Sequence, residues 1–163
     1  MTNVVSNSSP LINLARIERF ELLQHFYGEI VISPAVYDEV VTRGNERDGS
    51  QDVRAAKWIR QQSPQDQLAV DALAADLDRG EASAIILARE LNAKCLLIDE
   101  IRGRRIAMSL GISVVGTIGI LARAKRENII ANVKDELDRL RLRGTWIHPR
   151  LYQDVLLMVG EKT

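Results

Sequence analysis

The sequence predicts an α/β fold in which helices cover both faces of a parallel sheet. Short apolar runs, typical of buried strands, alternate along the chain with segments whose apolar residues recur at helical spacing. The clearest unit is a helical pattern at about residues 80–91, followed by the apolar run 94–98. Ser9–Pro10 and Ser33–Pro34 each mark a helix start, because serine suits the N-cap and proline the first helical position.

Length and composition narrow the class of protein. A chain of 163 residues is long enough for one domain with a hydrophobic core, and we expect a single domain over residues 1–163. Its 22 basic and 22 acidic residues give no net charge, which argues against a strongly basic nucleic-acid binder or membrane anchor but allows a local basic patch. There is no apolar run near the ~18–20 residues of a membrane span and no signal-peptide pattern. One cysteine, Cys95, cannot form an internal disulfide, so we expect a cytoplasmic protein.

The other elements follow from the same patterns in chain order. In the first half we expect a strand at 3–6, then a helix from Ser9 that continues past a break to Gly28. A strand at 29–33 follows, and then a helix from Ser33 that includes Asp38 and Glu39. After these we expect an exposed loop at 42–51, a helix through 53–59, a loop at 61–65 and a helix at 68–77.

In the second half we expect a helix at 102–110, a strand at 112–115 and a helix at 117–126. Ile130, Val133, Leu137 and Leu140 then recur at helical spacing, and Gly144 suits the end of that helix. A last short helix follows His148–Pro149. The core would therefore span about residues 3–126, with a helical extension at about 128–163.

Polar side chains are expected to meet at one edge of the sheet. A helix and the strand after it are antiparallel when a short turn joins them, so Glu81 at a helix start and Asp99 after a strand lie at the same carboxyl edge. The same topology brings Asn7 and Glu39 there. Acids that converge repel each other, and a divalent cation would relieve the repulsion. Hard oxygen ligands suit Mg²⁺ or Mn²⁺, and such an ion can generate hydroxide and neutralise charge at a phosphorus centre.

Four segments carry a resemblance to a known family. VVSNSSPLINLARI, ISPAVYDEV, LDRGEASAIILARE and LLIDEIRGRRIAMSLGISVVGTIGIL together span most of the chain to about residue 126. In this order and spacing the chain resembles the PIN-domain nucleases, the group that includes VapC-type toxins. The resemblance implies a three-layer α/β/α sandwich with a five-stranded parallel sheet, and a Mg²⁺- or Mn²⁺-dependent ribonuclease site. It also implies an RNA substrate, a homodimer and, for the toxins, a small antitoxin protein that blocks the site.

The resemblance places the four metal-site positions on Asn7, Glu39, Glu81 and Asp99, with the three acids as catalytic residues. The first position is usually an aspartate. An asparagine carbonyl can still bind a metal, but one negative charge is lost and metal affinity should fall. Asp38 or Glu100 is a candidate to compensate. With this resemblance, the first hypothesis is an RNA endonuclease that acts as the toxin of a toxin–antitoxin pair. The second is a catalytically weakened module that binds RNA or protein. The third is a ligand-binding or receiver-like α/β domain.

Each candidate residue also has a structural interpretation. Asp78 and Glu81 fit a capping box, with Asp78 as the N-cap. Asp99 could cap the helix that follows it, Glu39 could lie on a solvated helix face, and Asn7 could form an Asx-turn.

Three arginines lie just past Asp99. Arg102, Arg104 and Arg105 could hold RNA phosphates, because the arginine fork suits phosphate oxygens. Ion pairs with nearby acids are the alternative.

Overall fold

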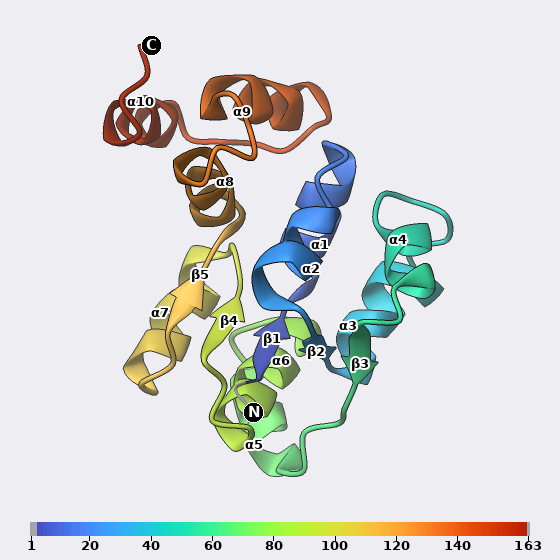
Figure 1. Cartoon of the computed structure of the whole chain (residues 1–163). Helices are drawn as coiled ribbons and strands as arrows, with labels where there is room; N and C mark the ends of the chain where they lie inside the picture. The colour runs from blue at the N-terminus through green and yellow to red at the C-terminus, as the bar shows by residue number, and fades with distance from the viewer. Residues whose placement is uncertain (1–2, 163) are drawn as a thin grey trace.

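Five parallel strands form the sheet of the computed structural model, which describes residues 3–162 (Figure 1). Their order is β3-β2-β1-β4-β5. The central strand β1 (Val4–Ser6) pairs with β2 (Ile30–Ile32) and β4 (Cys95–Leu97), while β3 (Ile59–Gln61) and β5 (Val114–Val115) form the two edges. Because all strands are parallel, their carboxyl ends lie at one edge of the sheet.

Helices cover the sheet on both faces, as the sequence predicts. Right-handed crossovers place α5, α6 and α7 on the face opposite α1, α2 and α4, and α6 contacts β1 and β4. The helical elements are α1 (Ser8–Arg16), α2 (Glu21–Tyr27), α3 (Pro34–Tyr37), a π-helical turn η1 (Asp38–Thr42), α4 (Ser50–Ala55), α5 (Gln67–Leu73), α6 (Arg79–Glu90), α7 (Ile101–Ser109), α8 (Thr117–Arg126), α9 (Val133–Leu142) and α10 (Pro149–Met158).

Burial explains why the sequence predicts the inner strands well. Every residue of β1, β2 and β4 is buried, so each of these strands is a continuous run, largely of β-branched and other apolar residues. Ser33 accepts a hydrogen bond from the N–H of Val36 (3.1 Å) and Pro34 begins α3, as expected. Gly144 directly follows Arg143, the C-cap residue of α9, and has a φ of +95°. This confirms that Gly144 ends the helix.

Several expectations about local structure are wrong, among them the position of β3, the start of α1 and the exposed loop at 42–51, in which Gly44, Gly49 and Ser50 are buried and α4 already begins. Strand β3 occupies Ile59–Gln61, where we expected the end of a helix and then a loop. This edge strand has only Ile59 partly buried and exposes Arg60, so it lacks the apolar run of a buried strand. Helix α1 begins at Ser8 with Asn7 as its N-cap residue, so Ser9 is not the cap, and Pro10 still lies in the first turn, where its missing N–H costs no hydrogen bond.

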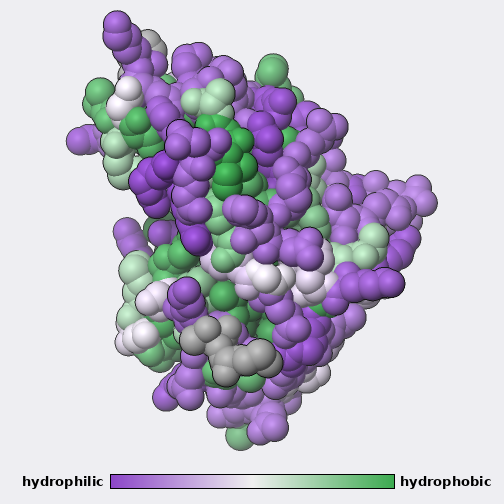
Figure 2. Space-filling view, viewed as in Figure 1, coloured by the Kyte–Doolittle hydropathy of each residue, from purple (hydrophilic) through white to green (hydrophobic). Residues whose placement is uncertain are grey.

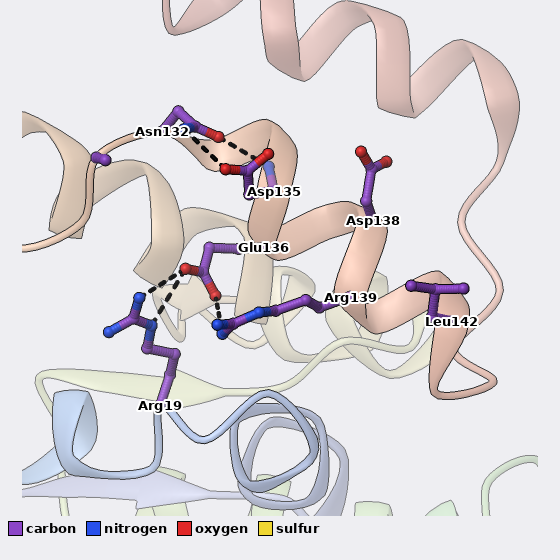
Figure 3. A pocket seen from close by; sticks show the side chains of 8 residues that line it. Arg19, Asn132, Asp135, Glu136, Asp138, Arg139 and Leu142 are labelled. Atoms are coloured by element: carbon purple, nitrogen blue, oxygen red, sulfur yellow. Dashed lines mark hydrogen bonds and ion pairs between the residues drawn. The ribbon is translucent and has the colours of Figure 1, made fainter.

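A buried acid ties the C-terminal helices to the start of the chain (Figure 3). Glu136 on α9 is 4% exposed and lies between two guanidinium groups. Its Oε1 accepts from Nη2 (2.8 Å) and Nε (3.2 Å) of Arg19, which follows α1, and its Oε2 accepts from Arg139 (3.4 Å). Figure 1 shows α9 and α10 above α8, and the hydrophobic core continues into both through Leu137 and Leu156.

The Glu136 pairing gives the first prediction. Glu136→Gln keeps the shape but removes the charge that both arginines contact, so the free energy of unfolding should fall by about 1–3 kcal/mol in urea denaturation. The control is Glu127→Gln, which breaks the exposed pair with Arg123 (2.6 Å) and should cost less than about 0.5 kcal/mol. Equal effects of the two substitutions would contradict the role assigned to Glu136.

Candidate active site

Asn7 lies at the carboxyl end of β1 with its side chain buried (2% exposed). Its backbone N–H donates to the carbonyl of Leu97 (2.8 Å), which fixes the end of β1 beside the end of β4. The side-chain Nδ2 donates to Oε2 of Glu100 (3.1 Å). Among residues 3–162, the buried Oδ1 has no hydrogen-bond partner, and the side chain does not cap α1. A buried oxygen without a donor is costly, so this atom is available to a ligand.

Glu81 lies in the first turn of α6 and is 7% exposed. Its backbone N–H donates to Oδ1 of Asp78 (2.7 Å), and its Oε1 accepts from the N–H of Asp78 (3.4 Å), so the expected capping box is present. The other oxygen, Oε2, lies beside α7, only 3.0 Å from where a Cβ on Gly103 would be. Glu81 therefore combines a structural role with a second oxygen that faces away from the cap.

Glu39 reaches the same region from η1. This π-helical turn differs from the regular helix we expected, and such turns often occur at functional sites. Glu39 is partly buried, and its Oε2 lies 2.7 Å from where a Cβ on Gly80 would be. The same position is 3.4 Å from Oδ1 of Asp78 and 3.7 Å from Oδ1 of Asn7. A side chain at residue 80 would thus fill the space onto which these oxygens converge.

Glu100, the N-cap residue of α7, completes this group. It accepts hydrogen bonds from Nδ2 of Asn7 and from the hydroxyl of Ser9. We call Asn7, Glu39, Glu81 and Glu100 the acidic cluster. Four separate elements of the chain, β1, η1, α6 and the β4–α7 junction, bring these residues together.

Asp99, the fourth residue expected at the metal site, makes its hydrogen bonds outside the acidic cluster. Its Oδ1 accepts from the backbone N–H of Thr117 (2.6 Å), and its Oδ2 accepts from the Thr117 hydroxyl (2.7 Å) and from Nδ2 of Asn13 (2.9 Å). It therefore caps α8 rather than α7, the helix that follows it. Successive side chains of extended backbone point in opposite directions, so Asp99 and Glu100 diverge after β4.

Burial and mutual repulsion raise the pKa of two acids in the cluster. Burial raises the pKa of Glu81 to about 8, and its contact with Asp78 and the charge of Glu100 act in the same direction. Burial also raises the pKa of Glu39, with Asp78 and Glu100 again contributing, while the Ser8 hydroxyl and Arg43 lower it. Negative charge is therefore insufficiently compensated here, and a cation would be stabilised.

The cluster fits a hard divalent cation by its chemistry. Among residues 3–162, no three His, Cys, Asp or Glu side chains stand in an arrangement ready to hold an ion, so the carboxylates are neighbours rather than a formed ligand shell. The donors are nevertheless carboxylate oxygens together with the unpartnered amide oxygen of Asn7, the oxygen ligands that Mg²⁺ and Mn²⁺ prefer.

The three expected RNA-binding arginines have different surroundings. Arg102 donates to the carbonyl of Asp76 (3.2 Å), and the partly buried Arg104 donates to the carbonyl of Ile98 (3.0 Å). Arg105 is exposed. Their assignment to RNA phosphates stays a prediction.

Sequence reasoning did not single out Arg43. Its guanidinium pairs with Asp38 (2.9 Å), and it lines a pocket of about 410 Å³ beside the acidic cluster. Glu39, Asp78 and Gly80 line the same pocket. Arg43 is the C-cap residue of η1, and its positive charge so close in sequence to Asp38 and Glu39 was the signal available.

Comparison with known proteins identifies the family. A family model described as a PIN domain matches residues 3–161, so the chain belongs to the PIN-domain family. PIN domains are typically nucleases, and they generally use divalent metal ions and bind RNA. No curated protein sequence matches the chain.

A solved structure supports the fold. A PilT N-terminus domain protein from the archaeon Sulfolobus solfataricus P2 superposes with a TM-score of 0.51 at 21% identity, over 76% of this chain and 93% of that chain. Within residues 3–162, no helix has the length and apolar character needed to cross a membrane.

The raised pKa of Glu81 gives a pH prediction for the metal-free protein. The folded state holds this proton up to about pH 8, whereas the unfolded state releases it near the ordinary value of 4.5. The folded state thus binds more protons between these values, so this group lowers the unfolding free energy as pH rises through that window. In chelator, Glu81→Gln should flatten this part of the urea-denaturation pH profile. An unchanged slope in the variant would show that Glu81 does not titrate this way.

Proposed function

We propose that this PIN domain is a divalent-metal-dependent RNA endonuclease that acts in the cytoplasm as the toxin of a toxin–antitoxin pair. The observation that carries the nuclease proposal is the acidic cluster, whose buried oxygens and raised pKa values favour a bound cation. The family resemblance supports the remaining parts, which are an RNA substrate, a small antitoxin protein as partner and a homodimer.

In this proposal Asn7, Glu39, Glu81 and Glu100 hold Mg²⁺ or Mn²⁺. When bound, the ion would lower the pKa of a water molecule and neutralise charge on a phosphate. Asn7 and Ser9 orient Glu100 through their hydrogen bonds, and Asp78 holds Glu81 through the capping box. Asp99 supports the site only indirectly, by holding the start of α8.

Glu39 also lines the pocket that Arg43 and Asp38 share, so it would connect the cation to this pocket. A carboxylate in contact with a divalent cation stays charged, so Glu39 would act as a ligand that helps to position a water molecule. Arg43, at the same pocket, is placed to contact a phosphate oxygen once its pairing with Asp38 opens.

A second candidate function is a weakened PIN domain that binds RNA or a protein without cutting. Asn7 favours it directly. The neutral amide contributes no charge, and its Nδ2 donates to an oxygen of Glu100 that a cation would otherwise contact. The two functions differ in whether the cluster binds a cation tightly enough to act.

Thermal unfolding with Mn²⁺ separates Glu100 from Asp99. For the wild type we expect stabilisation by about 2.7 kcal/mol at a hundredfold excess of Mn²⁺ over Kd. Glu100→Gln should lose most of this shift. Asp99→Asn should lower the stability without metal by about 1 kcal/mol, because it weakens the cap of α8, yet keep the Mn²⁺ shift. The reverse pattern would return Asp99 to the metal site and remove Glu100 from it.

RNA cleavage tests the activity itself. Asn7→Asp restores the missing charge and should cleave single-stranded RNA in Mn²⁺ about tenfold faster or more, equivalent to about 1.4 kcal/mol of transition-state stabilisation. Glu81→Gln is the inactive control. A wild type as fast as Asn7→Asp would exclude the weakened function, and no cleavage by either protein would refute the nuclease.

A further inference from the structure

A groove of about 830 Å³ runs along β5, the edge strand next to β4. Its lining combines residues of β5, α8, α10 and the start of α7. Aliphatic side chains dominate the lining, and two of them are strongly exposed, Ile101 at 69% and Met158 at 70%. Figure 1 places β5 at the margin of the sheet below α8, and Figure 2 shows hydrophobic surface between hydrophilic side chains at this level.

The backbone of β5 can accept a further strand. The carbonyls of Ser113 and Val115 accept hydrogen bonds from Leu96 (2.8 Å) and Ile98 (2.9 Å) of the β4 segment. In a parallel strand, alternate residues direct their N–H and C=O groups to opposite sides. The N–H and C=O of Val114 therefore face away from β4, toward the open edge. Strand β5 has only two residues, and no other strand of the described residues pairs with its outer edge.

Charge around the groove is mainly positive. Lys94, Arg104, Arg123 and Arg126 line it together with one acid, Asp99. Arg123 is paired with Glu127 (2.6 Å) and Arg104 donates to the carbonyl of Ile98, so Lys94 and Arg126 are the two exposed cations on which the proposal depends. Since the whole chain has no net charge, this is a local excess of cations over an apolar surface.

We propose that this groove binds an extended segment of a partner protein that alternates acidic and aliphatic side chains and adds to β5 as a sixth strand. Main-chain hydrogen bonds to Val114 would provide affinity, and the aliphatic lining and the cations would select the sequence. The lining fits a peptide better than RNA, because stacking of bases needs aromatic faces and Tyr27 is the one aromatic residue among the described residues that line the groove. This binding site does not depend on the proposed nuclease activity.

A phage-displayed library of random peptides, panned against the full-length protein, tests the proposal. We expect enrichment of acidic, aliphatic sequences. Synthetic peptides of these sequences should lose about tenfold in affinity for the double variant Lys94→Glu/Arg126→Glu, because two attractions become repulsions. The matched control reverses two exposed cations of the opposite half of the sheet, Arg54→Glu/Lys57→Glu, and should bind as the wild type does.

Three results would overturn the proposal. The first is that the enriched peptides bind both double variants equally. The second is that single-stranded RNA displaces the peptides from the wild type. The third is that the wild type is a dimer and only the groove variant is a monomer, which would make a second copy the occupant. Hydrogen exchange on the wild type keeps the test decisive even if the groove variant fails to fold. The amide of Val114 must become protected when the peptide binds, and an unprotected amide would refute strand addition.

Discussion

The convergence of acidic side chains at the carboxyl edge of the sheet is the constraint on which the proposed site depends. Parallel strands and right-handed crossovers bring Glu39, Glu81 and Glu100 together with Asn7, and burial then makes their charge costly. Three features make the cluster possible in the metal-free state. Asp78 shares its capping box with Glu81, Asn7 and Ser9 donate to Glu100, and Glu81 retains its proton to about pH 8. A bound cation would neutralise the carboxylates more completely than these hydrogen bonds and the retained proton do.

Glycines shape the same edge. A Cβ on Gly80 would lie 2.7 Å from an oxygen of Glu39, and a Cβ on Gly116 would lie 2.9 Å from Oδ1 of Asp99. A Cβ on either glycine would force the nearby carboxylate to move. Both glycines therefore let carboxylates approach the backbone closely. Gly80 serves the acidic cluster, whereas Gly116 serves the cap that Asp99 provides for α8. Two neighbouring acids after β4 therefore have different partners: Asp99 bonds to Thr117 and Asn13, whereas Glu100 bonds to Asn7 and Ser9.

The inner strands and most helices could be predicted because burial on both faces imposes continuous apolar runs, as in β4. The edge strand β3 could not, since its exposed residues carry no such signal. Topology alone correctly directed Asn7, Glu39 and Glu81 to one region. The different partners of Asp99 and Glu100 were beyond the sequence, because they depend on which way the chain turns as it leaves the strand, and one residue of shift reverses every side chain.

Crystals soaked in Mn²⁺ and measured at the manganese absorption edge would show where the cation binds. We predict an anomalous peak in contact with Glu81 and Glu100, near the unpartnered Oδ1 of Asn7, with Asp99 still bonded to Thr117. A peak coordinated by Asp99, or no peak at the acidic cluster under saturating Mn²⁺, would contradict this prediction.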